Sequence, residues 1–182
     1  MATESPTAAT PISLTRMCKY SLDWEPLHGR SGHEVGRLLL ERLYRAHTGK
    51  TLPEIRIAER GKPYFPEGHL HFSISHTKGH AFCVLSDRPV GIDAEEMDRD
   101  VKLKNAEKIL SPTEMERFLS ADDKRSALLR LWVLKEASVK LTGEGLRGYR
   151  IPTDFDPDDP RILEIDGCYV AILTDKGENH AL

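Results

Sequence analysis

Apolar side chains recur at helical spacing in two long stretches, one in each half of the chain. The first, SGHEVGRLLLERLYRAHTG, has Ser31 at a suitable N-cap position, Glu34 three residues later, and Gly49 at its end. The second, KRSALLRLWVLKEASVKLTG, ends at Gly143. Between them, SPTEMERFLS opens with serine at the N-cap, proline at N1 and glutamate at N3, a favourable helix start. The pattern predicts two long helices and a short one.

Apolar runs bounded by turn residues predict the strands. They are RMCKYSLDW, residues 55–59, LHFSISH and HAFCVLS joined by TKG, VGIDAEE, and RILEI and CYVAIL joined at DG. A long helix followed by a hairpin therefore occurs once in each half. The GHAFCVL pattern of the first hairpin also matches GCYVAIL in the second.

This repetition predicts an α+β fold with two pseudo-symmetric lobes, each a long helix packed on a small antiparallel sheet. We expect a flexible tail over residues 1–13, a first lobe over 14–89 and a second lobe over 90–182. The lobes would pack face to face, so the natural cleft would lie between them. The alternative is that any two α+β segments would share this much pattern.

Composition and charge narrow the classes of partner. Of 182 residues, 39% are hydrophobic and 30% are charged, which is ordinary for a globular protein with a core. The net charge of -3 provides no broad attraction to nucleic acid or anionic membranes. Three widely spaced cysteines form no CxxC motif, and no apolar run approaches the length of a membrane span. The sequence predicts a cytoplasmic protein that binds neither nucleic acid nor membrane.

Two carboxylates in the VGIDAEE strand are the first candidate for chemistry. Asp93 and Glu95 lie two residues apart, so both side chains leave the same face of the strand. Neighbouring carboxylates repel each other, and a hard cation such as Mg²⁺ is a common reason to bring them together. The simpler alternative is a solvated strand end within the acidic run DAEEMDRD.

Other candidates are equally open when each is taken alone. Glu136 and Lys140 lie four residues apart on the second long helix, where a surface ion pair is the simplest interpretation. The same positions can instead add a third carboxylate to an oxygen site and bring a lysine to a phosphate. His76 ends a strand and Lys62 lies in a turn, and both are more simply structural or solvated residues.

Four blocks of sequence, taken together and in order, change this interpretation. GKPYF, FSISHT, VGIDAEE and LWVLKEASVKLTGEGL closely resemble the signature of the 4′-phosphopantetheinyl transferases. The resemblance is to the surfactin-type branch, whose single chain contains two similar lobes. It runs from Gly61 to Leu146, about half of the chain.

The resemblance implies transfer of 4′-phosphopantetheine from coenzyme A to a serine of an apo acyl or peptidyl carrier protein, with release of adenosine 3′,5′-bisphosphate. Asp93, Glu95 and Glu136 would hold Mg²⁺, or Mn²⁺, on the pyrophosphate of coenzyme A. Glu136, or a water that it orients, would also accept the proton of the serine. Lys140 would contact the phosphate and stabilise the leaving group.

Coenzyme A contacts also follow from the resemblance. Lys62, Ser75 and His76 match positions that contact coenzyme A, with His76 near the 3′-phosphate. Lys135 lies beside these motif residues and receives no definite role.

The segment before the first helix departs from the family pattern, because it is short where the family often brings extra basic residues to the 3′-phosphate. Arg30, His33 and Arg37 are the candidate substitutes here. They lie near a helix N-terminus, where the backbone itself favours an anion.

Family resemblance further implies a monomer whose partner is an acidic carrier protein. A basic patch would then be expected at Lys102, Lys104 and Lys108, or at Lys124 and Arg125, although solvated charge is the simpler explanation. Two alternative functions stay open. One is a non-catalytic module that binds coenzyme A or a carrier protein, and the other is a Mg²⁺-dependent phosphohydrolase acting on a nucleotide pyrophosphate.

Overall fold

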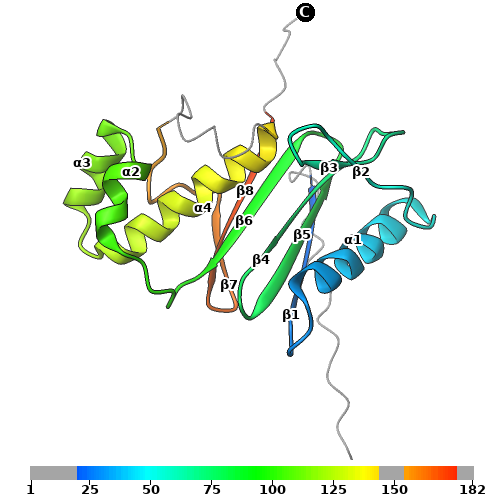
Figure 1. Cartoon of the computed structure of the whole chain (residues 1–182), viewed down its shortest axis with the longest axis horizontal. Coiled ribbons are helices and arrows are strands. Elements are labelled where there is room, and N and C mark those ends of the chain that lie inside the picture. The colour runs from blue at the N-terminus through cyan, green and yellow to red at the C-terminus, as the bar shows by residue number, and fades with distance from the viewer. Residues whose placement is uncertain (1–19, 144–153, 176–182) are drawn as a thin grey trace, which may run out of the picture.

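A computed structural model describes residues 20–143 and 154–175, which form a mixed α+β fold (Figure 1). The strands are β1 (Tyr20–Pro26), β2 (Arg56–Ile57), β3 (Pro63–Tyr64), β4 (His71–His76), β5 (His80–Ser86), β6 (Val90–Glu96), β7 (Ile162–Ile165) and β8 (Cys168–Thr174). The helices are α1 (Gly32–Thr48), the single 3₁₀ turn η1 (Leu103–Asn105), α2 (Ala106–Ile109), α3 (Pro112–Ser120) and α4 (Lys124–Thr142). The predicted α+β class is confirmed.

Helix ends follow the local signals in the sequence. Both long helices stop at a glycine in the left-handed conformation, Gly49 with φ of 70° and Gly143 with φ of 72°. The short helix α3 has a complete capping box between Ser111 and Glu114. At the start of α1, Ser31 is the N-cap residue, but its side chain makes no capping hydrogen bond.

Strand limits differ slightly from those expected. The first strand begins at Tyr20, and the earlier part of its predicted range, like the tail over residues 1–13, lies outside the described residues. The thiols of Cys83 and Cys168 are buried and free. Burial raises the pKa of Cys168 to about 11. Within the two described ranges, no helix is long and apolar enough to cross a membrane.

Two three-stranded antiparallel sheets carry the fold. The first has the order β1-β5-β4 and the second the order β6-β8-β7, so in each the last strand in sequence lies between the other two. Helix α1 packs on the first sheet and α4 on the second, and Figure 1 shows both helices on the near face of the sheets. Apolar side chains from β1 and β5 and from β6 and β8 form one shared cluster, which joins the sheets through a common core.

The two sheets meet along their edge strands β4 and β6. Serine hydroxyls take the place of a backbone ladder there: Ser73 Oγ accepts from the backbone N–H of Ile92, and Ser75 Oγ accepts from that of Ala94, each at 3.2 Å. Unpaired edge groups would otherwise be buried at a cost. The seam therefore fixes the position of β6, and of its carboxylates, relative to β4.

Helix α4 approaches β6 closely because residue 91 is glycine. A Cβ at Gly91 would lie 2.1 Å from the backbone oxygen of Ala137 and 2.4 Å from the backbone nitrogen of Leu141. Neither backbone atom can move without shifting the helix, so only glycine permits this spacing.

We expect Gly91→Ala to lower the free energy of unfolding by about 1–3 kcal/mol, because the added methyl group pushes α4 away from the sheet. Thermal and chemical denaturation measure this effect. Gly68→Ala is the control, since its added Cβ would meet nothing closer than 3.3 Å. Equal losses in the two variants would contradict the close approach as the cause.

Candidate functional site

A cavity of about 520 Å³ opens where β4, β6, the C-terminal half of α4 and the loop before β3 converge. Most of the residues singled out in the sequence line it, namely Lys62, Ser75, His76, Asp93, Glu95 and Lys140, together with His33 from α1. Segments far apart in the chain therefore build one pocket, as the order of the four sequence blocks suggested.

Asp93 on β6 accepts hydrogen bonds from side chains of two other elements in this cavity. Its Oδ1 accepts a hydrogen bond from Ser75 Oγ of β4 at 3.0 Å and another from Lys140 Nζ of α4 at 2.7 Å. Its Oδ2 is the one buried side-chain nitrogen or oxygen, among the described residues, that has no hydrogen-bond partner. Because an unpartnered buried carboxylate oxygen is costly, this atom indicates a place for a ligand.

The other two predicted carboxylates lie on the elements that pack together around Asp93. Glu95 leaves the same face of β6 and forms an ion pair with Arg99. Glu136 is half-buried on α4, one turn before Lys140, and α4 packs directly on β6. As the side chains stand, no three His, Cys, Asp or Glu residues within the described ranges gather closely enough to hold a metal ion.

The donor set nevertheless fits Mg²⁺ in its chemistry. This ion prefers hard oxygen ligands, and it usually takes one or two carboxylates together with substrate phosphates. Asp93 offers a buried oxygen that no protein group uses, and Glu95 shares its face of the strand. Asp93, Glu95 and Glu136 are the residues that would hold the ion.

Lys62 ties the loop before β3 to the end of α4. Its Nζ donates to the backbone oxygen of Leu141 at 2.6 Å, and its stem packs against Gly143. Burial lowers the pKa of the Lys62 ammonium. A cation at the carbonyl end of a helix is favourably placed, and here it also borders the cavity.

Two imidazoles meet at the other wall of the cavity. The rings of His33 and His76 lie edge to face, with centroids 4.9 Å apart. Helix α1 reaches this point because Gly32 leaves room, since a Cβ there would lie 2.6 Å from the His76 ring. Burial, and then the nearby His33 and Lys140, lower the pKa of His76. An anion bound here would reverse the effect of these neighbours.

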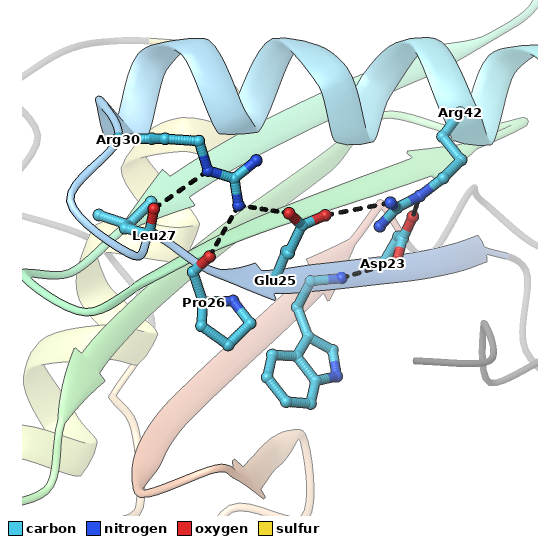
Figure 2. Close-up of polar contacts among 7 residues, drawn as sticks. Asp23, Glu25, Pro26, Leu27, Arg30 and Arg42 are labelled. Carbon is cyan, nitrogen blue, oxygen red and sulfur yellow. Dashed lines mark hydrogen bonds and ion pairs between the residues drawn. The ribbon is translucent and has the colours of Figure 1, made fainter. Parts of the chain in front are cut away.

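Arg30 and Arg37, by contrast, are not among the described residues that line the cavity. Figure 2 shows Arg30 turned toward β1, where it pairs with Glu25 and donates to the backbone oxygens of Leu27 and Pro26, each at 3.1 Å. This pairing lowers the pKa of Glu25. Arg37 lies exposed on α1. Of the three candidate substitutes for the 3′-phosphate, the structure brings only His33 to the cavity wall.

Lys135 also lies away from the cavity, although it neighbours Glu136 in the sequence. Its ammonium pairs with the Oε2 of Glu114 at 2.7 Å, and both residues are at most 1% exposed. Glu114 further accepts from the backbone N–H groups of Ser111 and Phe155. Lys135 therefore joins α4 to α3 and to the segment that follows residue 153.

Sequence reasoning missed two contributors to the site. Ser73, two residues before Ser75 on β4, accepts a hydrogen bond from the β6 backbone. The two serines at alternate positions of an otherwise apolar strand could have indicated that both face the same neighbour. Arg60 lines the cavity next to Gly61. In the sequence it had the appearance of an ordinary charged, solvated turn residue.

Comparison with known proteins points to the same family as the sequence motifs that line the cavity. Residues 89–178 match the family model described as the 4′-phosphopantetheinyl transferase superfamily. A 4′-phosphopantetheinyl transferase of Bacillus subtilis is 34% identical over 93 residues, which are 50% of this chain and 41% of that protein. The transferase HetI of Nostoc sp. is 29% identical over 148 residues, or 76% and 62% of the two chains.

A third relative is the transferase AcpT of Escherichia coli O157:H7, which is 36% identical over 114 residues, 60% of this chain and 56% of that protein. The chain thus spans between 41% and 62% of the length of these three relatives. The matched segment includes β6 and α4, which carry Asp93, Glu95, Glu136 and Lys140. Through this segment, the chain belongs to the 4′-phosphopantetheinyl transferase superfamily.

Proposed function

We propose that the protein transfers 4′-phosphopantetheine from coenzyme A to a serine of an apo acyl or peptidyl carrier protein. The observation that carries the proposal is Asp93, held by Ser75 and Lys140 at the cavity wall with its Oδ2 buried and unpartnered. A site that presents a partnerless carboxylate oxygen beside an ammonium group suits a cation and a phosphate together.

In the proposed reaction, the serine oxygen forms a bond to the β-phosphorus of the coenzyme A pyrophosphate. The bond from that phosphorus to the bridging oxygen breaks, and adenosine 3′,5′-bisphosphate leaves with the electron pair. Glu136, or a water that it orients, accepts the serine proton. Lys140 lies within hydrogen-bond distance of Asp93 and Ser75, and it neutralises charge on the phosphate. Bound Mg²⁺ would supply further charge stabilisation at the pyrophosphate.

We also propose that the chain is a two-lobed member of the surfactin-type branch, with lobes over 14–89 and 90–182. Matching strand registers support the division. In the first sheet Asp23 pairs with Cys83, and in the second Asp93 pairs with Ala171, each at the fourth position of its seven-residue strands. Ser75 and His76 then come from one lobe and Asp93 from the other, so coenzyme A would bind between them.

The carrier protein would approach the cavity with its acidic helix. Lys102, Lys104 and Lys108 are exposed around η1, and Leu103 beside them is 43% exposed. A mixed basic and apolar surface of this kind suits an acidic, amphipathic partner. The alternative patch is less available, since Arg125 donates to the backbone oxygens of Met97 and Arg99, and Lys124 donates to that of Ala121.

Measuring the release of adenosine 3′,5′-bisphosphate by chromatography tests the proposal against its alternatives. We expect release from coenzyme A only when Mg²⁺ and an apo carrier protein are both present. Release without any carrier would instead indicate a phosphohydrolase. Binding of coenzyme A without release on several apo carriers would indicate a non-catalytic module.

Replacing His76 should weaken coenzyme A binding more than it slows turnover. We expect His76→Ala to raise KM for coenzyme A about 10- to 150-fold with little change in kcat, because the loss is one charge-assisted contact of about 1.5–3 kcal/mol. Dephospho-coenzyme A, which lacks the 3′-phosphate, should bind the wild type and the variant equally. A fall in kcat at unchanged KM would contradict this role.

The same residue predicts a pH dependence of binding. Since the pKa of His76 is lowered in the free protein, its imidazole is neutral at pH 7, and a bound phosphate favours the protonated form. Coenzyme A binding should therefore strengthen as pH falls from about 7.5 toward 6 and should take up a proton. Calorimetry in buffers of different ionisation enthalpy measures that proton, which His76→Ala should not take up.

A further inference from the structure

The first strand of each sheet carries the same pair of acids at the same two places. Strands β1 (YSLDWEP) and β6 (VGIDAEE) are both seven residues long, with aspartate fourth and glutamate sixth. Asp23 and Glu25 of β1 therefore correspond to Asp93 and Glu95 of β6. The register supports this equivalence, because the fourth residue of each strand faces the fourth residue of its partner strand, Cys83 or Ala171.

The long helices can be matched in the same way from their ends. Both finish in Thr-Gly, with the glycine in the left-handed conformation, at Gly49 in α1 and Gly143 in α4. Seven residues before these glycines are Arg42 in α1 and Glu136 in α4. The helix position that carries the third predicted metal-binding carboxylate in one half thus carries a cation in the other.

Arg42 bridges the two acids of β1. Its Nε donates to Asp23 Oδ2 at 2.6 Å and one of its terminal nitrogens donates to Glu25 Oε2 at 3.1 Å, as Figure 2 shows. The carboxylate of Asp23 is 6% exposed, so this guanidinium is its main compensating charge. The hydrogen bond to Asp23 raises the pKa of Arg42, so the cation is permanent.

The two aspartates differ in what their second oxygen meets. Asp23 has both oxygens occupied, since Oδ1 accepts from the backbone N–H of Trp24 at 2.9 Å while Oδ2 accepts from Arg42. Asp93 has Oδ1 occupied by Ser75 and Lys140, whereas Oδ2 is buried without a partner. In the first sheet, the guanidinium of Arg42 occupies the second oxygen of the aspartate. In the second sheet, the corresponding oxygen is left for a cation that binds from solution.

We propose that Asp23, Glu25 and Arg42 form a metal-independent counterpart of the Asp93, Glu95 and Glu136 site, in which the guanidinium of Arg42 takes the place of the divalent cation. The comparison rests on the proposed metal site, but the proposal concerns the first sheet and goes beyond the reaction. It follows that, of the two matched acid sets in the described residues, only the one at the cavity binds a divalent cation, and that α1 stays on β1 without metal.

Restoring a carboxylate at position 42 is the first test. Arg42→Glu recreates the three-acid set, so we expect it to bind one more equivalent of Mn²⁺ than the wild type, measured by electron paramagnetic resonance of the free ion. Arg45→Glu is the matched control, because it makes the same charge change three residues later at a more exposed position, and it should bind no extra Mn²⁺. A folded Arg42→Glu with the wild-type stoichiometry would overturn the proposal.

The reverse exchange gives a second test that does not require Arg42→Glu to fold. Glu136→Arg should place a guanidinium beside Asp93 Oδ2, so in chelator we expect it to melt about 2–4 °C above Glu136→Gln. Its melting temperature should also no longer respond to Mn²⁺. If Glu136→Arg melts below Glu136→Gln in chelator, an arginine at this position does not replace the cation and the proposal fails.

Discussion

Asp93→Ala should lower transfer to a carrier protein by at least about 10³-fold while the protein stays folded. The variant removes the oxygen that the metal would use and releases Lys140 from its position, and a loss of about 4 kcal/mol in the transition state corresponds to that factor. The free energy of unfolding should change by no more than about 1–2 kcal/mol, because losing the Oδ1 hydrogen bonds from Ser75 and Lys140 is partly offset by removing a buried Oδ2 that has no partner. Rates with excess coenzyme A and carrier protein, together with melting curves, measure both effects.

The matched control for Asp93→Ala is Asp98→Ala, an exposed aspartate of the same acidic run. It tests the alternative that these acids merely form a solvated strand end. Glu136→Ala should reproduce the loss seen for Asp93→Ala, since both residues serve the same cation. Near-normal turnover in either Asp93→Ala or Glu136→Ala, with equal Mg²⁺ dependence, would contradict the metal assignment.

Glu114→Gln should cost about 3–5 kcal/mol of the free energy of unfolding, the largest stability effect that we expect in this chain. The substitution leaves the ammonium of Lys135 buried without a counter-charge and weakens the bonds to the backbone N–H groups of Ser111 and Phe155. For a chain of this size, the melting temperature should fall by about 6–20 °C. Calorimetry measures the change directly.

The double variant Glu114→Met with Lys135→Met separates the charge effect from packing. Replacing both partners of a buried ion pair with apolar residues of similar size is often nearly neutral, so the double variant should recover most of the lost stability. Transfer activity at low temperature should also survive, because Lys135 faces away from the cavity. A double variant that is stable but inactive would show that Lys135 takes part in the reaction.

Local signals in the sequence predicted the helices well because their causes are local. The glycines at positions 49 and 143 and the capping box at Ser111 each act within a few residues. The same holds for Asp93 and Glu95, whose shared face follows from strand geometry alone. These features can be read from short windows of the chain.

Contacts between distant segments could not be predicted in this way. The bonds from Ser73 and Ser75 to the β6 backbone depend on which strand edges meet, and the close approach at Gly91 depends on how α4 crosses the sheet. Lys135 shows the difficulty within one helix. Its neighbours at four-residue spacing, Leu131 and Val139, are buried, and Lys135 lies on the same face. Because lysine is almost always exposed, the sequence did not predict that this one is buried.

The similarity between the two halves could be predicted from the sequence only in part. The repeated helix and hairpin were readable from apolar spacing, whereas the equivalence of Asp23 with Asp93 required the strand registers. Arg30 could be proposed as a phosphate contact because it precedes a helix. Its short-range pairing with Glu25 accounts for its position away from the cavity.

Intact-mass spectrometry of an apo acyl carrier protein, incubated with this protein, coenzyme A and Mg²⁺, tests the central claim most directly. We predict that the carrier gains the mass of one phosphopantetheine group, that a chelator abolishes the gain, and that a carrier with alanine in place of the acceptor serine gains nothing. An unchanged carrier mass on several apo carriers, with wild-type protein that is folded and binds coenzyme A, would contradict the proposed transferase.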